Sequence, residues 1–445
     1  MDDFKRIAEK AVHTAKKHGA ETVEVAVTES VEFEVLVRKS KIENLTEATS
    51  RRIDITVSVD KKRASVTSSD LSEESIEELI VSALEICSIM DRDEYYALPD
   101  EDELGTADGD LEMFDEETTR IATAEKIRLA TEIEDTALSL DSRIISDGGF
   151  FSNSTQRIVI ANSLGFCDGY KKTSNSLGVS CAVDEAGGSG ENTAKKQSSY
   201  WYSAAVSFKG LEPAEEVARE AVKRTLRKLG ARKPKTQKIP IVFDNTTASS
   251  FLAHIASAVN GGNIYRRESF LVDKIGSEVA SSNITIIDDP LLKGRLGSRP
   301  FDSEGVRSRV NTVIEKGILK TYLMNSYQAR KLGKKTTGNA GEHSNLYIKP
   351  GSYTQSDIIA SIDSGLFLTF LSGPGANTTT GDFSQGAQGI WIEKGELTYP
   401  VDEFTIASTF QEMLEGITMV GDDIDWRRTI SSPTIKIDQI TISGL

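Results

Sequence analysis

Histidine side chains that could bind a metal or act as a general base are few in this sequence. The four are His13, His18, His254 and His343, and no two of them stand four residues apart. Many zinc peptidases place two histidines one helical turn apart with a glutamate between them, because both rings then project from one face of the helix. The histidine spacing therefore predicts no zinc motif of that kind.

The candidate nucleophiles are equally sparse. Cys87, Cys167 and Cys181 are odd in number and widely spaced, which fits neither a disulfide framework nor a cysteine zinc site. Cys87 falls on the apolar stripe of a predicted helix and is expected to be a core residue. No Gly-x-Ser-x-Gly motif occurs, so no serine nucleophile of that class is indicated.

Two acidic clusters could hold a cation. Acidic turns that cap strands are commoner than metal sites, so both clusters are interpreted as structural turns. The clusters are Asp288-Asp289-Pro290 and Asp422-Asp423-Ile424-Asp425.

A third acidic stretch, residues 91–117, was compared with a calcium-binding loop. Asp100 and Asp102 have the spacing of the first two ligands, but Leu104 and Leu111 stand where two later ligands should be. The stretch is therefore predicted to be a solvated linker.

Hydrophobic spacing predicts the elements that must position any site. Apolar residues at three- and four-residue spacing indicate a first helix from Phe4 to the region of Gly19, and strand-like alternation follows it. A second helix is predicted to begin near Asp70, with Glu73 completing a capping box. Further on, helices are predicted at 124–140 and 214–229, and strands at 157–161, 177–183 and 199–208. The Gly-rich residues 186–190 are predicted to be a flexible loop.

The basic, proline-interrupted residues 232–235 mark the main predicted domain boundary. Beyond it most segments have strand character. Residues 313–322 and 391–399 each predict a hairpin around a Lys-Gly turn, and 246–259 predict one long helix. The expected fold class is α+β, with amino-terminal helices on antiparallel sheets and a carboxy-terminal β-rich, barrel-like domain. The expected units are 1–98, 118–230 and 236–445.

The composition restricts the partners. The chain of 445 residues carries a net charge of −16, which disfavours direct binding to nucleic acid. The first residues lack the pattern of a signal peptide, and no apolar stretch is long enough to cross a bilayer. A cytoplasmic protein without a membrane anchor is expected.

Several short motifs occur in order along residues 249–433. Among them are Gly261-Gly262-Asn263, Arg299-Pro300-Phe301-Asp302, Gly338-Asn339-Ala340-Gly341, Thr380-Gly381-Asp382-Phe383 and Ser431-Ser432-Pro433. In this order the motifs resemble those of the TldD/PmbA family of metallopeptidases.

The resemblance implies a degenerate metal site. The TldD subunit of this family carries His-Glu-x-x-x-His on a helix and a later Cys. Those positions fall on Ala253, His254 and Ala258 in this sequence, and residues 372–377, where the Cys should be, contain none. The pattern is that of the TldE/PmbA branch, with no catalytic residue, no metal ligand and no cofactor of its own. His254 is expected to be a hydrogen-bonded core or interface histidine.

The resemblance also implies partners. A TldD-type catalytic subunit would hold the zinc, the chain would form a homodimer when alone, and an extended peptide would be the substrate. Asn339, Asn377, Thr378 and Asp382 lie in polar, Gly-rich turns and are candidates for contacting that peptide or the partner.

Two other functions compete with this scaffolding role. One is a stand-alone metallopeptidase with non-standard ligands such as His254, Glu268 and His343. The other is a modulator of DNA gyrase, a DNA topoisomerase, that acts through proteolysis of a protein partner.

Overall fold

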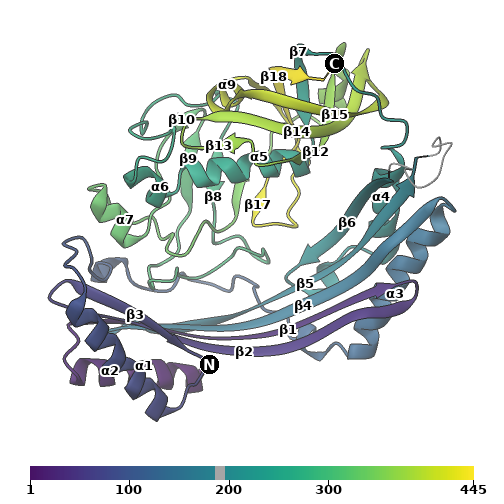
Figure 1. Ribbon diagram of the computed structural model, residues 1–445. Helices are drawn as coiled ribbons and strands as arrows, with labels where there is room; N and C mark the ends of the chain where they lie inside the picture. The colour runs from purple at the N-terminus through teal and green to yellow at the C-terminus, as the bar shows by residue number, and fades with distance from the viewer. Residues whose placement is uncertain (186–195, 445) are drawn as a thin grey trace.

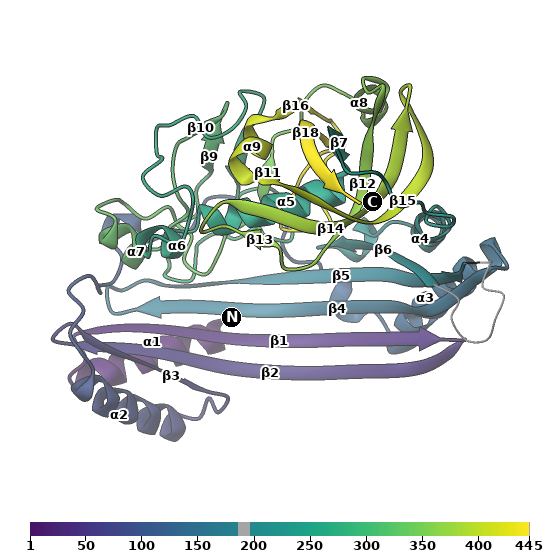
Figure 2. The ribbon, with the colours of Figure 1, turned by 45° about the horizontal axis from the view of Figure 1, so that its top comes forward.

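One long, curved antiparallel sheet carries the amino-terminal half of the chain (Figures 1 and 2). The computed structural model describes residues 1–185 and 196–444, so the Gly-rich loop predicted at 186–190 lies outside the described residues. Four of the six strands run for 17 to 19 residues. In sheet order the strands are β3 (Lys62–Ser68), β2 (Lys41–Val59), β1 (Thr22–Arg38), β4 (Ile144–Asn162), β5 (Cys167–Asp184) and β6 (Lys196–Ala205).

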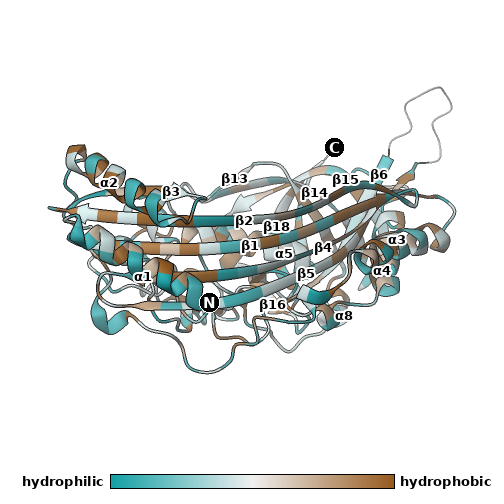
Figure 3. Cartoon of the chain, turned by 90° about the horizontal axis from the view of Figure 1, so that it is seen from below, coloured by the Kyte–Doolittle hydropathy of each residue, from teal (hydrophilic) through white to brown (hydrophobic). Residues whose placement is uncertain are grey.

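Helices cover the two ends of the convex face of this sheet, and the middle of that face has no described helix over it (Figures 1 and 3). Alternate strand residues such as Val25 and Ile55 pack under the first pair of helices, and Phe33 and Phe151 pack under the second. The sheet therefore has two separate apolar cores on one face. The first pair is α1 (Asp2–Lys17) and α2 (Glu73–Ile89), and the second is α3 (Thr123–Leu140) and α4 (Ala214–Leu226).

Two local predictions in this half were wrong. The second helix begins at Glu73, and Ser72 caps it by accepting a hydrogen bond from the backbone N–H of Ser75 (3.4 Å), so Asp70 lies outside the helix. Strand β4 begins at Ile144, well before the predicted residue 157. Cys87, in contrast, is buried as expected.

The acidic stretch 91–117 is not the solvated linker that was predicted. It lies against the carboxy-terminal domain, where the backbone N–H of Gly105 donates to the carbonyl of Gly305 (3.1 Å). Glu103 also pairs with Arg309 (2.5 Å). The stretch contains a 3₁₀ turn at Glu101–Glu103, and another follows at Thr118–Arg120. These contacts tie the sheet to the domain above it.

A closed five-stranded barrel forms the centre of the carboxy-terminal domain. The predicted barrel-like domain is therefore confirmed. The ring closes because β12 and β14 pair with each other, with Leu366 opposite Trp391. Two short strands, β13 (Ala376–Asn377) and β16 (Ile417–Val420), pair at its edges. The barrel strands are β12 (Ser364–Ser372), β7 (Gln237–Phe243), β18 (Ile435–Ser443), β15 (Glu396–Thr409) and β14 (Asp382–Glu393).

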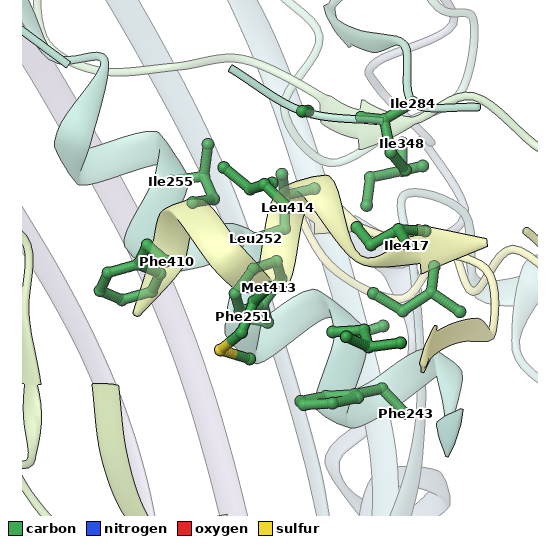
Figure 4. Packing of buried hydrophobic residues seen from close by; sticks show 14 of the residues in the cluster. Phe243, Phe251, Leu252, Ile255, Ile284, Ile348, Phe410, Met413, Leu414 and Ile417 are labelled. Atoms are coloured by element: carbon green, nitrogen blue, oxygen red, sulfur yellow. The ribbon is translucent and has the colours of Figure 1, made fainter. Parts of the chain in front are cut away.

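A smaller sheet and five helices complete this domain. The largest helix of the domain, α5 (Asn245–Ala258), packs Phe251, Leu252 and Ile255 against Phe410 and Met413 in the main core (Figure 4). The sheet, in order, consists of β10 (Ile318–Leu319), β9 (Asn311–Glu315), β8 (Ile286–Asp288), β11 (Leu346–Ile348) and β17 (Ile430–Ser431). The helices are α5 (Asn245–Ala258), α6 (Gly261–Tyr265), α7 (Ser326–Lys331), α8 (Gln355–Ala360) and α9 (Phe410–Glu415).

Both predicted Lys-Gly hairpins are present, in different sheets. Lys316-Gly317 joins β9 to β10, and Lys394-Gly395 joins β14 to β15. All four residues have positive φ, between 46° and 83°, which explains why glycine follows lysine at each turn. Within the described ranges, no helix is both long and apolar enough to cross a membrane.

Candidate functional site

Helix α5 carries the positions that the family motif would occupy. It begins because the carboxylate of Asp244 accepts a hydrogen bond from the backbone N–H of Thr247 (2.8 Å), which caps the helix. One side of the helix is packed into the domain core. Away from the core, Thr246, Ser250, Ala253 and Ser257 recur at four- and three-residue spacing and so form one stripe. Helix α5 itself lies between the barrel strands and the concave side of the long sheet (Figure 1).

A cavity of about 390 Å³ opens at the carboxy-terminal end of this stripe. Its walls come from α5 and α6, from the loop before β11 and from β17, and they are mostly polar. The lining residues are Ala253, Ala256, Ser257, Asn260, Asn263, Leu323, Asn339, Glu342, His343 and Ile430.

The three predicted motif positions have different surroundings. Ala253 is exposed and lines the cavity, whereas Ala258 is fully buried in the domain core. His254 is half-buried on a third side of the helix, where its ring lies 5.6 Å from that of Phe410 and 6.3 Å from that of Phe383. Burial lowers the pKa of His254, which favours the neutral ring.

Asp288 holds the polar loop that forms one wall of the cavity. Its buried carboxylate accepts hydrogen bonds from the Nδ2 of Asn339 (2.7 Å) and from the backbone N–H and hydroxyl of Ser344 (2.6 and 2.9 Å). Glu342 and His343 lie between these two anchors, so the loop presents both to the cavity. Burial lowers the pKa of His343. The first acidic cluster is therefore structural, as predicted.

The donor atoms around Ala253 do not match a zinc site. A catalytic zinc needs three protein ligands, usually histidine, cysteine or carboxylate. Of these types, only Glu342 and His343 line the cavity, and nowhere in the described ranges do three such residues gather closely enough to hold a metal. The alternative ligand set is also dispersed, because His254 faces aromatic rings and Glu268 pairs with Arg266 (2.7 Å).

Of the four predicted binding residues, only Asn339 lines this cavity. Asn377, Thr378 and Asp382 belong to the turn between β13 and β14. The Oδ1 of Asn377 accepts from the backbone N–H of Thr379 (2.9 Å), the carbonyl of Thr378 accepts from Phe270 (2.9 Å), and Asp382 accepts from the hydroxyl of Thr380 (2.6 Å). The first and third bonds hold the turn together, and the second ties the turn to the segment after α6.

Several lining residues were missed from the sequence. Ser257 stands four residues after Ala253, a spacing that places both on one helical face and could have identified it. Asn260 lies beyond the end of α5, where it caps α6. Glu342 carried no such signal, because its position depends on the anchoring of a loop to the distant Asp288.

The sheet opposite α5 offers a polar surface. On its concave face, the middle of the sheet carries polar side chains: Ser154 and Ser174 hydrogen-bond across β4 and β5 (2.8 Å), and Glu32 of β1 lies beside Ser154. A groove between a helix and such a sheet can bind a peptide through its backbone, since hydroxyl groups donate and accept without selecting a side chain.

Comparisons with known proteins give a consistent result. Family models described as the PmbA/TldA metallopeptidase domain 1, central domain and C-terminal domain match residues 23–87, 116–229 and 236–444. A metalloprotease PmbA homolog from Haemophilus influenzae is 36% identical over 98% of this chain and 94% of its own. A metalloprotease TldD homolog from the same organism is 28% identical over 72% of each chain.

Solved structures share the whole fold. A candidate modulator of DNA gyrase from Bacteroides thetaiotaomicron has a TM-score of 0.94 and 27% identity, with 100% of both chains covered. TldE from Thermococcus kodakarensis has a TM-score of 0.86 at 22% identity and covers 98% of this chain and 100% of its own. The second likeness concerns the fold alone.

Proposed function

This chain belongs to the TldD/PmbA family, in its PmbA/TldE branch, and we propose that it is the scaffolding and peptide-binding subunit of a two-subunit metallopeptidase. In this proposal a TldD-type subunit supplies the zinc and the catalytic residues. The chain described here supplies walls of the chamber in which an extended peptide is cleaved.

The observation that carries the proposal is the side chain at position 253. The stripe of α5 that faces the chamber is free of core contacts, as a catalytic helix needs, yet it presents the methyl group of Ala253 where a metal ligand would stand. A methyl group neither binds zinc nor activates water. The retained helix with a replaced ligand supports a role in binding and not in catalysis.

The open edge of β2 is the surface that we assign to the partner. β3 pairs with Ile53–Val59 of β2 only, so residues 41–52 have no neighbour on that side within the described chain. All twelve residues of this stretch are exposed, and Ile42 and Leu45 are 50% and 40% exposed. An unpaired strand edge with apolar side chains favours association with another strand or subunit.

Reconstitution tests the proposed function. The purified chain, a TldD-type subunit and their mixture are each assayed for cleavage of an unstructured protein that carries a fluorescent label. The zinc content of each sample is also measured. We expect cleavage only in the mixture, its loss on addition of a chelator, and zinc in the TldD-type subunit alone.

The contrary results are equally clear. Peptide cleavage by this chain alone, with about one zinc per chain retained through dialysis, would support the stand-alone metallopeptidase instead. A mixture that forms no complex in size-exclusion chromatography would remove the scaffolding role.

A further inference from the structure

A second cavity, of about 240 Å³, lies at the amino-terminal end of α5 where four elements meet. β6 and α4 form one side of it, and α5 and β12 form the other. The lining residues are Ser199, Tyr200, Trp201, Tyr202, Arg224, Arg227, Lys228, Thr246, Thr247, Ser250, Thr369, Phe370, Leu371 and Arg428.

The charge of this cavity is opposite to that of the protein. Its lining includes four cationic side chains, those of Arg224, Arg227, Lys228 and Arg428, and no aspartate or glutamate. The whole chain carries a net charge of −16. The basic side chains in this cavity are therefore not explained by an overall excess of lysine and arginine, and their clustering needs a local explanation.

The cations in the cavity are poorly neutralised. Arg224 pairs with Glu220 (2.7 Å) and approaches Asp244 (3.6 Å). The other three cations form no salt bridge within the described part of the chain, and the buried Nε of Arg227 has no hydrogen-bond partner there. The charges of Asp402 and Asp425 act on Lys228 and Arg428 only at longer range. Clustered, partly buried cations repel one another and are costly unless an anion binds among them.

The pKa values of two of the cations are shifted in the direction that such a cluster predicts, whereas, despite burial, Tyr202 and Asp425 raise the pKa of Arg428. Burial and the neighbouring Arg224 lower the pKa of Arg227 to about 10. Burial and Arg227 lower the pKa of Lys228 to about 8. Lys228 is thus still mostly protonated near neutral pH, and a bound anion would stabilise its charge.

Aromatic side chains hold the cations in place. The guanidinium carbons of Arg224 and Arg427 lie 3.7 and 3.6 Å from the centroid of Trp201, so they must contact opposite faces of its ring. Arg428 donates to the hydroxyl of Tyr202 (2.8 Å). A site of this kind is positioned before a ligand arrives, which reduces the entropy lost on binding.

The basic cavity continues toward the cavity at Ala253. Thr246 and Ser250 line the first, and Ala253 and Ser257 line the second, and all four belong to the same stripe of α5. The extended segment that contributes Arg428 to the basic cavity contributes Ile430 to the other. The stripe from Thr246 to Ser257 spans about 16 Å at 1.5 Å per residue, the length of about five residues of extended peptide.

We propose that the cavity around Arg227, Lys228 and Arg428 binds a carboxylate of the extended peptide and so anchors one end of the peptide along α5. The carboxylate belongs either to the C-terminus of the peptide or to an aspartate or glutamate in its last positions. This inference rests on the proposed function, since it concerns the peptide of the same chamber. It adds the substrate class, peptides with an anionic end.

Binding of labelled octapeptides to the isolated chain tests the inference without a catalytic partner. Three peptides of alanine, serine and threonine are compared by fluorescence anisotropy: a free acid, its C-terminal amide, and an amide with glutamate in the last position. We expect the free acid, the glutamate peptide or both to bind at least about tenfold more tightly than the amide, as hydrogen bonds to charged groups provide. Which of the two binds identifies the source of the carboxylate.

Charge-removing variants locate the effect. Lys228→Gln combined with Arg428→Gln should abolish the preference for the carboxylate and leave binding of the amide unchanged. Lys209→Gln, which removes an 81% exposed lysine paired with Glu117 outside the cavity, should keep the preference. Urea unfolding verifies that each variant is folded, and the comparison of acid with amide on the unaltered chain needs no variant.

Equal binding of all three peptides overturns the inference. Competition by inorganic phosphate without any difference between acid and amide also overturns it, because the cavity would then be a general anion site. If the complex is active but the isolated chain binds acid and amide peptides equally, this inference is wrong and the proposed function stands. A chain that prefers the acid but activates no TldD-type subunit removes the proposed function alone.

Discussion

The Nδ2 atom of Asn339 lies 2.7 Å from the Oδ2 atom of Asp288, and through this contact a buried carboxylate holds a loop that lines the cavity at Ala253. The two residues are far apart in the sequence. The loop carries Glu342 and His343, so the position of both side chains depends on Asp288.

Replacement of Asp288 should therefore destabilise the domain. Asp288→Ala removes three hydrogen bonds to a fully buried group, and we expect it to lower the free energy of unfolding by about 3 kcal/mol in urea titrations. Asp289→Ala is the matched control, because the Asp289 side chain accepts one backbone hydrogen bond, from Leu291, and should cost about 1 kcal/mol. Equal losses for the two variants would contradict the anchoring role.

Histidines at the two motif positions of α5 should behave differently. Ala258 is fully buried, so Ala258→His forces a large polar ring into a packed core and should lower stability by about 1–3 kcal/mol or more. Ala253→His faces the cavity and should be tolerated. Thermal unfolding measures both effects. Zinc titration of the double variant should detect no tight site, because residues 372–377 supply no cysteine as a third ligand.

The contribution of Asp302 to the stability of the protein should fall as the pH rises toward neutrality. Burial, together with the nearby Glu304, raises the pKa of Asp302 to about 7, from 3.8, although three backbone N–H groups donate to its carboxylate. Between these pH values the folded protein holds a proton that the unfolded chain has released, so raising the pH lowers the free energy of unfolding.

Urea midpoints measured from pH 4.5 to 8 test this dependence. We expect the loss of stability with rising pH to be smaller for Asp302→Asn than for the unaltered chain, because the variant lacks the carboxyl group that releases its proton in this range. An identical slope for the variant would show that other groups control the pH dependence.

The open edge of β2 should determine assembly. Ile42→Glu places a charge on this edge, and we expect it to weaken association with the TldD-type subunit, and self-association of the isolated chain, by at least about tenfold in analytical ultracentrifugation. Ile89→Glu is the control, since Ile89 is 82% exposed at the end of α2. Weakening by the control to the same extent would place the interface elsewhere.

Local patterns in the sequence predicted local structure well. The Lys394-Gly395 turn was predicted correctly, because positive φ is a property of a residue and its immediate neighbours. The apolar stripe around Cys87 likewise identified the buried face of α2. The capping residue was predicted wrongly as Asp70, where the structure has Ser72. Aspartate and serine both cap helices, so only the backbone geometry decides which of the two does so.

Long-range contacts account for what could not be predicted. The stretch 91–117 is acidic and contains glycines, as linkers are, and nothing near Gly105 in the sequence indicates its bond with Gly305. The early part of β4 was missed for a related reason. Gly149 and Asn153 stand on the convex face, where apolar residues would be expected to alternate. A Cβ atom at Gly149 would lie 2.3 Å from the carbonyl oxygen of Ala130 in α3, and the buried Asn153 donates a hydrogen bond to the carbonyl of Thr118 (3.1 Å), so tertiary contacts select both residues. The basic cavity was missed because its cations come from α4 and from the segment before β17, far apart in the chain.

The pairing of β1 with β4 has a consequence during synthesis. The two strands are separated by about a hundred residues, so when β1 leaves the ribosome its neighbour on one side has not yet been made. At about 5–20 residues per second, a long strand edge waits for roughly 5–20 seconds before β4 emerges to cover it. During that interval the exposed strand edge of the nascent chain can pair with other chains and so promote aggregation. A chaperone that binds extended segments would protect the chain during this interval.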